Sequence, residues 1–511
     1  MVKNLNPARS AVLILFMIHF VLLSFVIAQV FNETNNDDNL FKLKKIQLTE
    51  LKIEPDDLTQ YDYFGHSVDI DGDYAIIGAY GKNHNAGAAY IFKLETTGWQ
   101  QKAKLTLSDG DADDLLGYIV ALSGDVALVS GRGRKSVYIF EKPEGEWHDT
   151  NETARLHLTS PQYMSYFGDA MDISGDYVIV GDWQFGEVYV YEKPEEGWKD
   201  TTQTMILTPP VVAGGFGHAV AIDSDYAVVG AYLYSGDGPQ SGGAFIYKRD
   251  TTWKYQSVIQ PSDGADNDRF GLAVGIDGNR IVVGAPNKRQ AYVFVRDGEM
   301  WNEEDILERY SMYQADFGIG VAILGDTVIV GSYMDSDYEN DAGSASVFCR
   351  NASDWIHFNR IVPGDVHEDG LFGFSVALSG DYALVGSYGS NGDSLVAGQA
   401  YIYGDYIVPV AMRNNSNIAQ DFDLAQNYPN PFNPSTTISY TVGAHRNVPL
   451  QYIDLSIYDI LGQKVAILVN QKQPAGSYQI EWNASGFPSG LYFYRIQAGD
   501  FIQTKRMLLI K

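Results

Sequence analysis

The sequence has 511 residues but only one cysteine, Cys349. A single thiol cannot form an internal disulfide, and no Cys/His cluster with the spacing of a zinc site occurs. The sequence also lacks a phosphate-binding P-loop and the G-x-S-x-G motif of serine hydrolases. The fold must therefore be held by burial and hydrogen bonds, or by bound ions, and no catalytic motif indicates an enzyme.

Positive charge is scarce. The chain carries 36 Lys and Arg against 64 Asp and Glu, which gives a formal net charge of −28. Such a surface repels polyanions, so we expect no nucleic-acid partner and no electrostatic attachment to an anionic membrane. The acidic surface is compatible with cation binding, although it is also compatible with a role in solubility alone.

Long apolar runs are confined to the N-terminus. Lys3 and Arg9 precede the apolar stretch Ala11–Ala28, and small residues lie before Gln29. This pattern predicts a signal peptide over residues 1–28, although the run is also long enough for an uncleaved anchor. Nothing else in the sequence could span a bilayer as a helix, so we expect no transmembrane segment in the mature chain.

One short phrase recurs along the chain. A Phe-Gly pair, in one copy Leu-Gly, returns every 47–55 residues. The seven copies are Phe64-Gly65, Leu116-Gly117, Phe167-Gly168, Phe216-Gly217, Phe270-Gly271, Phe317-Gly318 and Phe372-Gly373. Seven residues after each motif glycine comes a turn, in most copies Gly-Asp, which suits a two-residue hairpin. Internal repeats of this length are typical of stacked or radially arranged units.

Each repeat contains the pattern of four short strands. The turn leads into a β-branched run such as "YAIIG", a variable loop leads into a third run such as "AYIF", and a tryptophan opens the fourth. These tryptophans are Trp99, Trp147, Trp198, Trp253, Trp301 and Trp355. Four strands repeated seven times predict an all-β protein with a seven-bladed β-propeller, because a radial arrangement lets each blade cover its neighbour.

The seventh repeat has no tryptophan-led fourth strand. The segment "IQLTELKIEPDD" (46–57), upstream of the first motif, resembles an orphan fourth strand. We predict that it completes the last blade, which would leave no blade edge open. The alternative is that "GDYIVPVAM" (404–412), directly after the third strand, supplies the missing strand.

The seven units resemble FG-GAP repeats, which build the propeller of integrin α-subunits. The resemblance implies calcium loops between second and third strands. Two loops have acidic residues at alternate positions, as calcium ligands often are. The candidate ligands are Asp335, Asp337, Glu339 and Asp341 in the sixth repeat, and Asp109, Asp111 and Asp113 before the second motif. The first group could equally be a solvated acidic loop and the second an ordinary turn. Calcium is the only cofactor that the sequence suggests.

Three long loops point to a binding surface. Tyr333, Tyr388 and Tyr80 each follow the glycine of the second strand by two residues, in repeats six, seven and one respectively, and these repeats would adjoin in a closed ring. We predict that they share a rim that contacts an extracellular protein or glycan, unless they only pack their loops. His66 and His218 occupy equivalent positions and could meet in a channel or pack at the blade ends. A polysaccharide-degrading enzyme and a structural module of a surface assembly are the alternative functions.

The residue composition changes after Tyr406. A polar linker precedes a proline-rich stretch, and alternating strand patterns follow, which predict a small β-sandwich. The expected division is a signal peptide (1–28), an N-terminal linker (29–42), the propeller (43–406), a second linker (407–420) and a C-terminal domain (421–511).

The tail resembles the type A C-terminal sorting domain of the type IX secretion system. The resemblance rests on "NYPNPFNP", "YDILGQKV", "AGSYQIEW" and "SGLYFYRIQAGDFIQTKRMLLIK". The first motif comprises Asn427, Tyr428, Pro429, Asn430, Pro431, Phe432, Asn433 and Pro434. The resemblance implies export through the periplasm of a Gram-negative bacterium, handling by the type IX machinery, and release or display at the cell surface. The leading hypothesis is therefore a secreted or surface-displayed, non-catalytic binding or adhesion propeller.

Overall fold

The computed structural model describes two β-rich parts of the chain. The described residues are 49–159, 165–309, 316–351, 354–389 and 396–404, and then 423–424, 427, 429–442, 451–460, 463–473, 476–498 and 501–510. The predicted signal peptide and both predicted linkers lie outside them, and the domain boundaries stay predictions. Within these ranges, no helix has the length and apolar character needed to cross a membrane.

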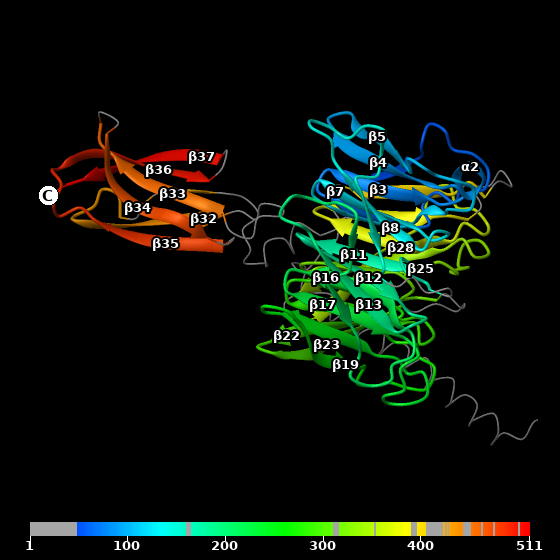
Figure 1. Ribbon diagram of the computed structural model, residues 1–511. Helices are drawn as coiled ribbons and strands as arrows, with labels where there is room; N and C mark the ends of the chain where they lie inside the picture. The colour runs from blue at the N-terminus through cyan, green and yellow to red at the C-terminus, as the bar shows by residue number, and fades with distance from the viewer. Residues whose placement is uncertain are drawn as a thin grey trace, which may run out of the picture. The chain divides into compact units, whose positions relative to one another are not determined.

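The described residues between 49 and 404 form seven sheets, each with four antiparallel main strands (Figure 1). The first four sheets are β2(Val68–Asp71), β3(Tyr74–Ala79), β4(Ala88–Glu95) and β5(Gly98–Thr106); β6(Leu116–Ser123), β7(Val126–Gly131), β8(Ser136–Glu141) and β10(Ala154–His157); β11(Ala170–Ser174), β12(Tyr177–Asp182), β13(Glu187–Glu192) and β15(Met205–Leu207); β16(Phe216–Asp223), β17(Tyr226–Ala231), β18(Ala244–Arg249) and β19(Trp253–Ile259). The other three are β20(Ala273–Asp277), β21(Arg280–Ala285), β22(Gln290–Asp297) and β23(Met300–Glu308); β24(Val321–Leu324), β25(Thr327–Ser332), β26(Ser344–Asn351) and β27(Asp354–Ile361); β28(Phe372–Ser379), β29(Tyr382–Ser387), β30(Gln399–Gly404) and β1(Thr49–Ile53). A four-residue helix, α2 (Lys82–Asn85), lies in the β3–β4 loop.

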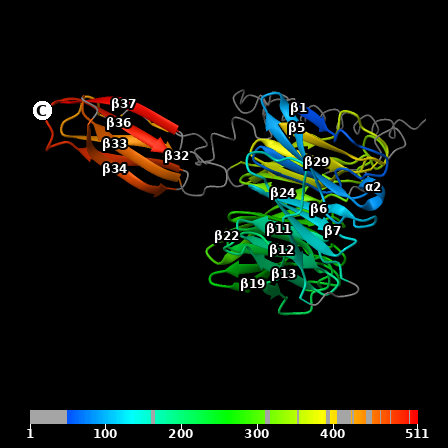
Figure 2. The same cartoon turned by 45° about the horizontal axis from the view of Figure 1, so that its top comes forward.

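The sheets close into a ring, as an all-β propeller requires. The first strands of the sheets, β2, β6, β11, β16, β20, β24 and β28, contact one another in that order, and β28 contacts β2. Both views show the blue first sheet beside the yellow last one (Figures 1 and 2). β1 pairs with β30 from Thr49 opposite Gly404 to Ile53 opposite Ala400. The prediction that the upstream segment completes the last sheet is therefore confirmed.

The repeated glycines are explained by close contact between sheets. A Cβ atom on Gly78, at the end of β3, would lie 2.0 Å from the carbonyl oxygen of Gly117 in the next motif. Gly117 itself has φ +86°, a conformation that favours glycine. The same approach joins Gly181 to Gly217, Gly230 to Gly271, Gly284 to Gly318, Gly331 to Gly373 and, across the ring closure, Gly386 to Gly65. The Phe-Gly motif recurs because, in these pairs, the glycine that ends the second strand of one sheet contacts the motif glycine of the next sheet.

Side chains also link neighbouring sheets at the hairpin end of the ring. In several sheets, the side chain of the residue before the turn accepts a hydrogen bond from a backbone N–H in the turn of the next sheet. Asp71 accepts from Gly124 at 2.7 Å, and Ser379 closes the ring by accepting from Gly72 at 2.9 Å. Asp223 and Asp277 make the equivalent bonds, both at 2.6 Å. These bonds satisfy turn amides that have no strand partner.

Two of the predicted fourth strands begin later than expected. Trp147 and Trp198 are buried but do not open a strand, and the fourth strands are β10 and β15 instead. After each tryptophan, the chain first adds a two-residue parallel strand to the preceding sheet: β9(Thr150–Asn151) pairs with β5, and β14(Thr201–Thr202) pairs with β10. Each extra pairing covers an outer edge that would otherwise be open.

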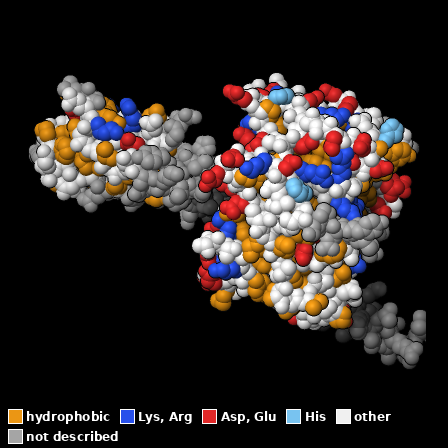
Figure 3. Space-filling view, in the orientation of Figure 1, with side chains coloured by type: hydrophobic (Ala, Val, Ile, Leu, Met, Phe, Trp, Pro, Cys, Tyr) orange, Lys and Arg blue, Asp and Glu red, His pale blue; other side chains and the backbone are white. Residues whose placement is uncertain are grey.

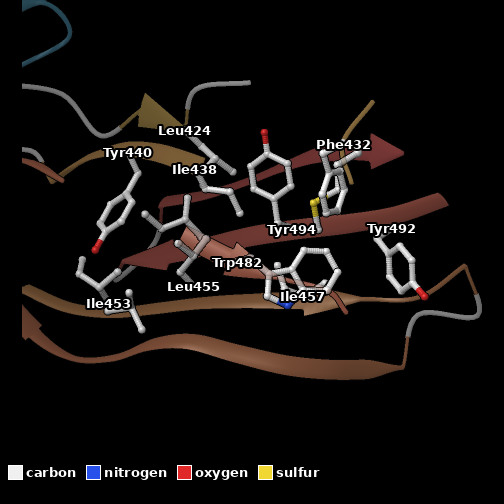
Figure 4. Close-up of a cluster of buried hydrophobic side chains, with 14 of the residues drawn as sticks. Leu424, Phe432, Ile438, Tyr440, Ile453, Leu455, Ile457, Trp482, Tyr492 and Tyr494 are labelled. Carbon is white, nitrogen blue, oxygen red and sulfur yellow. The ribbon is translucent and has the colours of Figure 1, made fainter. Parts of the chain in front are cut away.

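The C-terminal part is a β-sandwich, as predicted. One sheet contains β31(Asp423–Leu424), β32(Ser435–Val442) and β35(Gly476–Asn483); the other contains β34(Lys464–Gln473), β33(Gln451–Tyr458), β36(Gly490–Ala498) and β37(Phe501–Leu509). Between the sheets lies an apolar core with Trp482, Tyr494 and Leu455 near its centre (Figure 4). The alternation of buried and exposed residues along β36 produces this one-sided burial.

Candidate binding site at the loop end of the ring

A chain of aromatic contacts runs round the end of the ring where the second strands finish and the first strands begin. Its members occupy three positions of each repeat: the residue before the motif, the residue after it, and the second residue after the glycine that ends the second strand. We call this set the aromatic belt. It comprises Tyr63, His66, Tyr80, Tyr118, Arg132, Tyr166, Trp183, His218, Tyr232, Tyr333, Phe374 and Tyr388.

One half of the belt contains the three tyrosines predicted to share a rim. Phe374 contacts both Tyr333, at a centroid separation of 5.5 Å, and Tyr388, at 4.9 Å. His66 then contacts Tyr388 at 5.0 Å and Tyr80 at 4.9 Å. The structure therefore brings all three tyrosines into one contact chain, with each of them half-buried. Whether they bind a ligand stays a prediction.

The other half of the belt was not predicted. Arg132 lies 4.3 Å from the ring centroid of Tyr118 and 5.8 Å from that of Tyr166. Tyr166 stacks on Trp183 at 4.5 Å, and the belt continues through His218 to Tyr232 at 4.7 Å. The signal was present in the sequence, because these residues stand at the same repeat positions as Tyr80, His66 and Tyr63.

The two histidines pack within the belt. Nδ1 of His66 donates to the carbonyl oxygen of Tyr118 at 2.9 Å, and burial lowers the pKa of His66 to about 4. His218 makes the equivalent bond to Leu272 at 3.3 Å, and burial lowers its pKa as well. Both rings are therefore neutral near pH 7, and they present aromatic edges and faces.

Polar groups interrupt the aromatic surface at two places. Nε of Arg132 lies 3.0 Å from Oδ1 of Asp169. Burial raises the pKa of Asp169 to about 6 although Arg132 opposes the rise. The fifth repeat has no aromatic residue at the belt positions, and a hollow of ≈ 340 Å³ between the fifth and sixth repeats is lined mostly by polar residues that include Asp266, Arg289 and Asp316. The belt thus combines apolar faces with hydrogen-bonding groups.

The central channel has a different lining. A cavity of ≈ 260 Å³ is bounded mostly by Val, Ala, Ile and Leu side chains of the first strands, together with Asp69 and Asp172. Each carboxylate accepts two backbone N–H bonds; those of Asp69 come from Ile70 at 2.8 Å and Leu122 at 2.7 Å. Burial raises the pKa of Asp69 to about 8 and that of Asp172 to about 7. Both carboxylates therefore tie one sheet to the next, and the enzyme alternative gains no support from this channel.

The predicted calcium ligands of the sixth repeat have basic partners. Arg309 and Arg360 both contact Asp335, whose side chain is fully buried, and both contact Asp337. Burial alone would raise the pKa of Asp335, but bonds from Ser344 and Arg309 hold it below its ordinary value. Glu339 is exposed, and in the described ranges no three His, Cys, Asp or Glu side chains converge as a metal site requires. As arranged, this loop does not fit a divalent cation, and calcium binding stays an untested prediction.

The second predicted loop is also arranged around an arginine. Arg134 bonds Asp109 at 2.7 Å and Asp114 at 2.7 Å, and lies 3.6 Å from Asp111. The hydrogen bond from Arg134 lowers the pKa of Asp109. Asp113 instead accepts a bond from Asn85 at 3.1 Å.

The basic residue follows a repeat rule. Arg134 stands four residues after the last glycine position of the second strand, and Lys82 and Lys288 stand at the same place in repeats one and five. Each of these basic side chains forms ion pairs with Asp residues of the loop that precedes the Phe-Gly or Leu-Gly motif of its own repeat. Asp335 occupies this place in repeat six, where the charges are reversed and the arginines come from elsewhere. An ion pair thus fastens these loops in four repeats.

The proline-rich motif is built into the C-terminal sandwich. Phe432 is buried against Trp482, its N–H donates to the carbonyl oxygen of Leu508 at 3.0 Å, and Oδ1 of Asn430 accepts the N–H of Leu508 at 2.9 Å. Asn427 is buried and bonds Thr436 at 2.9 Å. Pro429, Asn430, Pro431 and Asn433 are exposed, Pro434 is half-buried, and Tyr428 lies outside the described residues. The motif covers the edge of β37.

Comparison with protein families agrees with this architecture. The FG-GAP repeat model matches residues 49–92, 99–140, 201–247, 253–294, 312–348 and 355–403. The chain belongs to the FG-GAP repeat family. The matches omit β11, β12 and β13 of the third sheet of this FG-GAP propeller, which the structure nevertheless contains. Residues 426–511 match the secretion system C-terminal sorting domain.

Several solved structures are similar to this chain at low identity, and no curated protein sequence matches it. PorZ, a surface component of the type IX secretion system of Porphyromonas gingivalis, is 13% identical over 90% of this chain and 61% of its own, with a TM-score of 0.42. The WD40 domain of Toxoplasma gondii coronin is 9% identical over 72% of this chain and 88% of its own, with a TM-score of 0.42. A fungal alcohol oxidase of the AA5 family is 11% identical over 91% of this chain and 99% of its own, with a TM-score of 0.47. At these scores, the likenesses carry no argument about function.

Proposed function

We propose that this FG-GAP propeller is a non-catalytic binding protein that captures a glycan on its aromatic belt. Its sorting domain directs export by the type IX secretion system to the cell surface or beyond it. The observation that supports the proposal is the belt itself: half-buried aromatic side chains joined across neighbouring repeats at one end of the ring.

The chemistry of the belt suits sugars. Pyranose rings present C–H groups that pack on aromatic faces, and their hydroxyl groups require hydrogen-bonding partners nearby. Tyr63 stacks on Tyr80 at 4.8 Å and Tyr166 on Trp183 at 4.5 Å, which gives two flat platforms. Arg132 and Asp169 lie beside the second platform and can bond hydroxyl groups. Because the two belt histidines are neutral, the recognition surface itself adds little charge.

A protein ligand would use the same residue types, since tyrosine, tryptophan and arginine dominate protein–protein contacts. We favour the glycan because polar groups such as Arg132 and Asp169 lie between the aromatic rings of the belt. Interfaces with proteins more often have a broad apolar centre. The protein ligand therefore becomes an outcome of the test.

The test is a glycan array with the purified secreted protein, followed by calorimetry on the strongest ligand. Tyr80→Ala and Trp183→Ala should each weaken binding by about 5–30-fold, which corresponds to ~1–2 kcal/mol per aromatic contact. Tyr255→Ala is the matched control, because Tyr255 is exposed on β19 and outside the belt. Binding to proteins but to no glycan would contradict the proposal, as would equal losses in the belt variants and the control.

A further inference from the structure

Beyond ligand capture, the structure points to the surface by which the C-terminal domain is recognised during export. We infer that the outer face of the β34-β33-β36-β37 sheet docks on a component of the secretion machinery that presents acidic and apolar groups. The opposite face of this sheet is buried in the sandwich core through residues such as Tyr494 and Ile496. The outer face has no partner among the described residues of the domain.

The outer face has an unusual share of exposed apolar side chains. Leu491 and Leu508 face each other across β36 and β37, and each is 38% exposed. Ile502 on β37 is 57% exposed, and Ile467 on β34 is 55% exposed. Leu491 and Leu508 thus form one apolar pair across neighbouring strands, and Ile502 and Ile467 add exposed apolar side chains to the same face. Exposed apolar surface of this kind marks contact sites.

The same face is basic within an acidic protein. Arg495 and Arg506 point outward between the apolar residues, and Arg495 lies 5.1 Å from the ring centroid of Tyr458. Nζ of Lys464 lies 5.8 Å from the centroid of the same ring and pairs with Asp454. The space-filling view shows Lys and Arg among hydrophobic side chains on the visible face of this domain (Figure 3).

The sequence shows the same contrast of charge. Residues 421–511 contain seven Lys and Arg and six Asp and Glu, so essentially all of the net charge of −28 belongs to the rest of the chain. An acidic partner would repel the propeller and attract the outer face of the sorting domain. Such a partner would therefore bind the sorting domain and would not bind the acidic propeller.

The other sheet of the sandwich provides the internal comparison. The outward residues of β32 are Ser435, Thr437 and Ser439, which carry hydroxyl groups instead of apolar or basic groups. The exposed Pro431 of the proline-rich motif belongs to the segment that bonds the edge of β37. The motif therefore bonds the edge strand of the proposed docking sheet.

The test is export of the full chain in a host that has the type IX system. Arg495→Glu with Leu508→Glu should reduce the exported fraction at least tenfold and leave folded protein in the periplasm, because both changes oppose an acidic, apolar partner. Ser435→Glu with Ser439→Glu also adds two acidic groups, at positions that face Asn483 and Gln479 of β35, and should be exported like the wild type. Unchanged export of the first variant, or equal loss in both, would overturn the inference.

A second double variant with milder substitutions distinguishes loss of docking from misfolding. Arg495→Gln with Leu508→Thr keeps the outward residues compatible with a strand and should still reduce export several-fold. The melting temperature of each purified variant is measured alongside export. Normal export of a milder variant that melts with the wild type would refute the docking role. Glycan binding by the purified variants should stay unchanged, which separates this inference from the function of the belt.

Discussion

The ion pair of the first repeat gives the sharpest test of how the loops of the ring are held. Nζ of Lys82 lies 2.8 Å from Oδ2 of Asp62, with side-chain exposures of 3% and 2%. Replacing Lys82 by methionine leaves the Asp62 carboxylate buried without its cation. Breaking a buried pair in this way costs about 3–5 kcal/mol. Because Asp62 retains bonds from the backbone and hydroxyl of Thr59, we expect the lower end, ~3 kcal/mol.

The fifth repeat provides the matched control. Lys288 occupies the same place between Asp263 and Asp268, but its exposure is 18% and those of its partners are 42% and 11%. Solvent screens this pair, so Lys288→Met should lower the free energy of unfolding by only ~1 kcal/mol. The double variant Lys82→Met with Asp62→Asn removes the stranded charge and should recover part of the loss.

Urea unfolding of the purified protein, followed by circular dichroism, measures these differences. The midpoint should fall clearly for Lys82→Met, slightly for Lys288→Met, and to an intermediate degree for the double variant. Equal effects at the two lysines would refute the argument from burial. A double variant that is less stable than Lys82→Met would show that the stranded charge is not the cause.

Three further predictions concern the ring. Because burial raises the pKa of Asp69 to about 8 and that of Asp172 to about 7, the stability that these two carboxyls contribute is fully present below about pH 4 and is lost as the pH rises to about 8. The difference in stability between the wild type and the variant with Asn at both sites, measured by thermal melts, should therefore change with pH by at most ~1.4 kcal/mol per pH unit and carboxyl. A difference that stays the same at every pH would contradict the raised pKa values. Millimolar calcium should leave the melting temperature unchanged, because Arg309 already neutralises Asp335; a rise of several degrees would show that calcium displaces the arginine. Deleting β1 (Thr49–Ile53) should expose the edge of β30 and cause aggregation, seen by light scattering; a monodisperse product would contradict closure through β1.

The repeat pattern predicted the strands and the ring because it records local geometry. Gly72 marks a hairpin, and the apolar run after it marks a strand that is buried on both faces. Trp147 misled the prediction, because the extra pairing of β9 with the preceding sheet does not change the local pattern.

The belt and the ion pairs depend on contacts between side chains that are distant in the sequence, within one repeat or across neighbouring repeats, and the local sequence pattern does not specify these contacts. Tyr80 was recognised by its position, yet the stack of Tyr166 on Trp183 depends on how the third repeat folds back on itself. The acidic loop at Asp335 matched a calcium pattern because the pattern counts carboxylates and does not include the arginine 26 residues upstream, Arg309. The position four residues after the second-strand glycine, basic in three repeats, was the signal available in the sequence.

The most direct test of the central claim is a crystal structure of the propeller with its best glycan. We expect a sugar ring stacked on Trp183 or Tyr80, with a hydroxyl group bonded to Arg132. The opposite end of the ring has its own hollow of ≈ 490 Å³, whose lining includes Arg249 and Arg296. A glycan bound in that hollow, with the belt empty, would contradict the account.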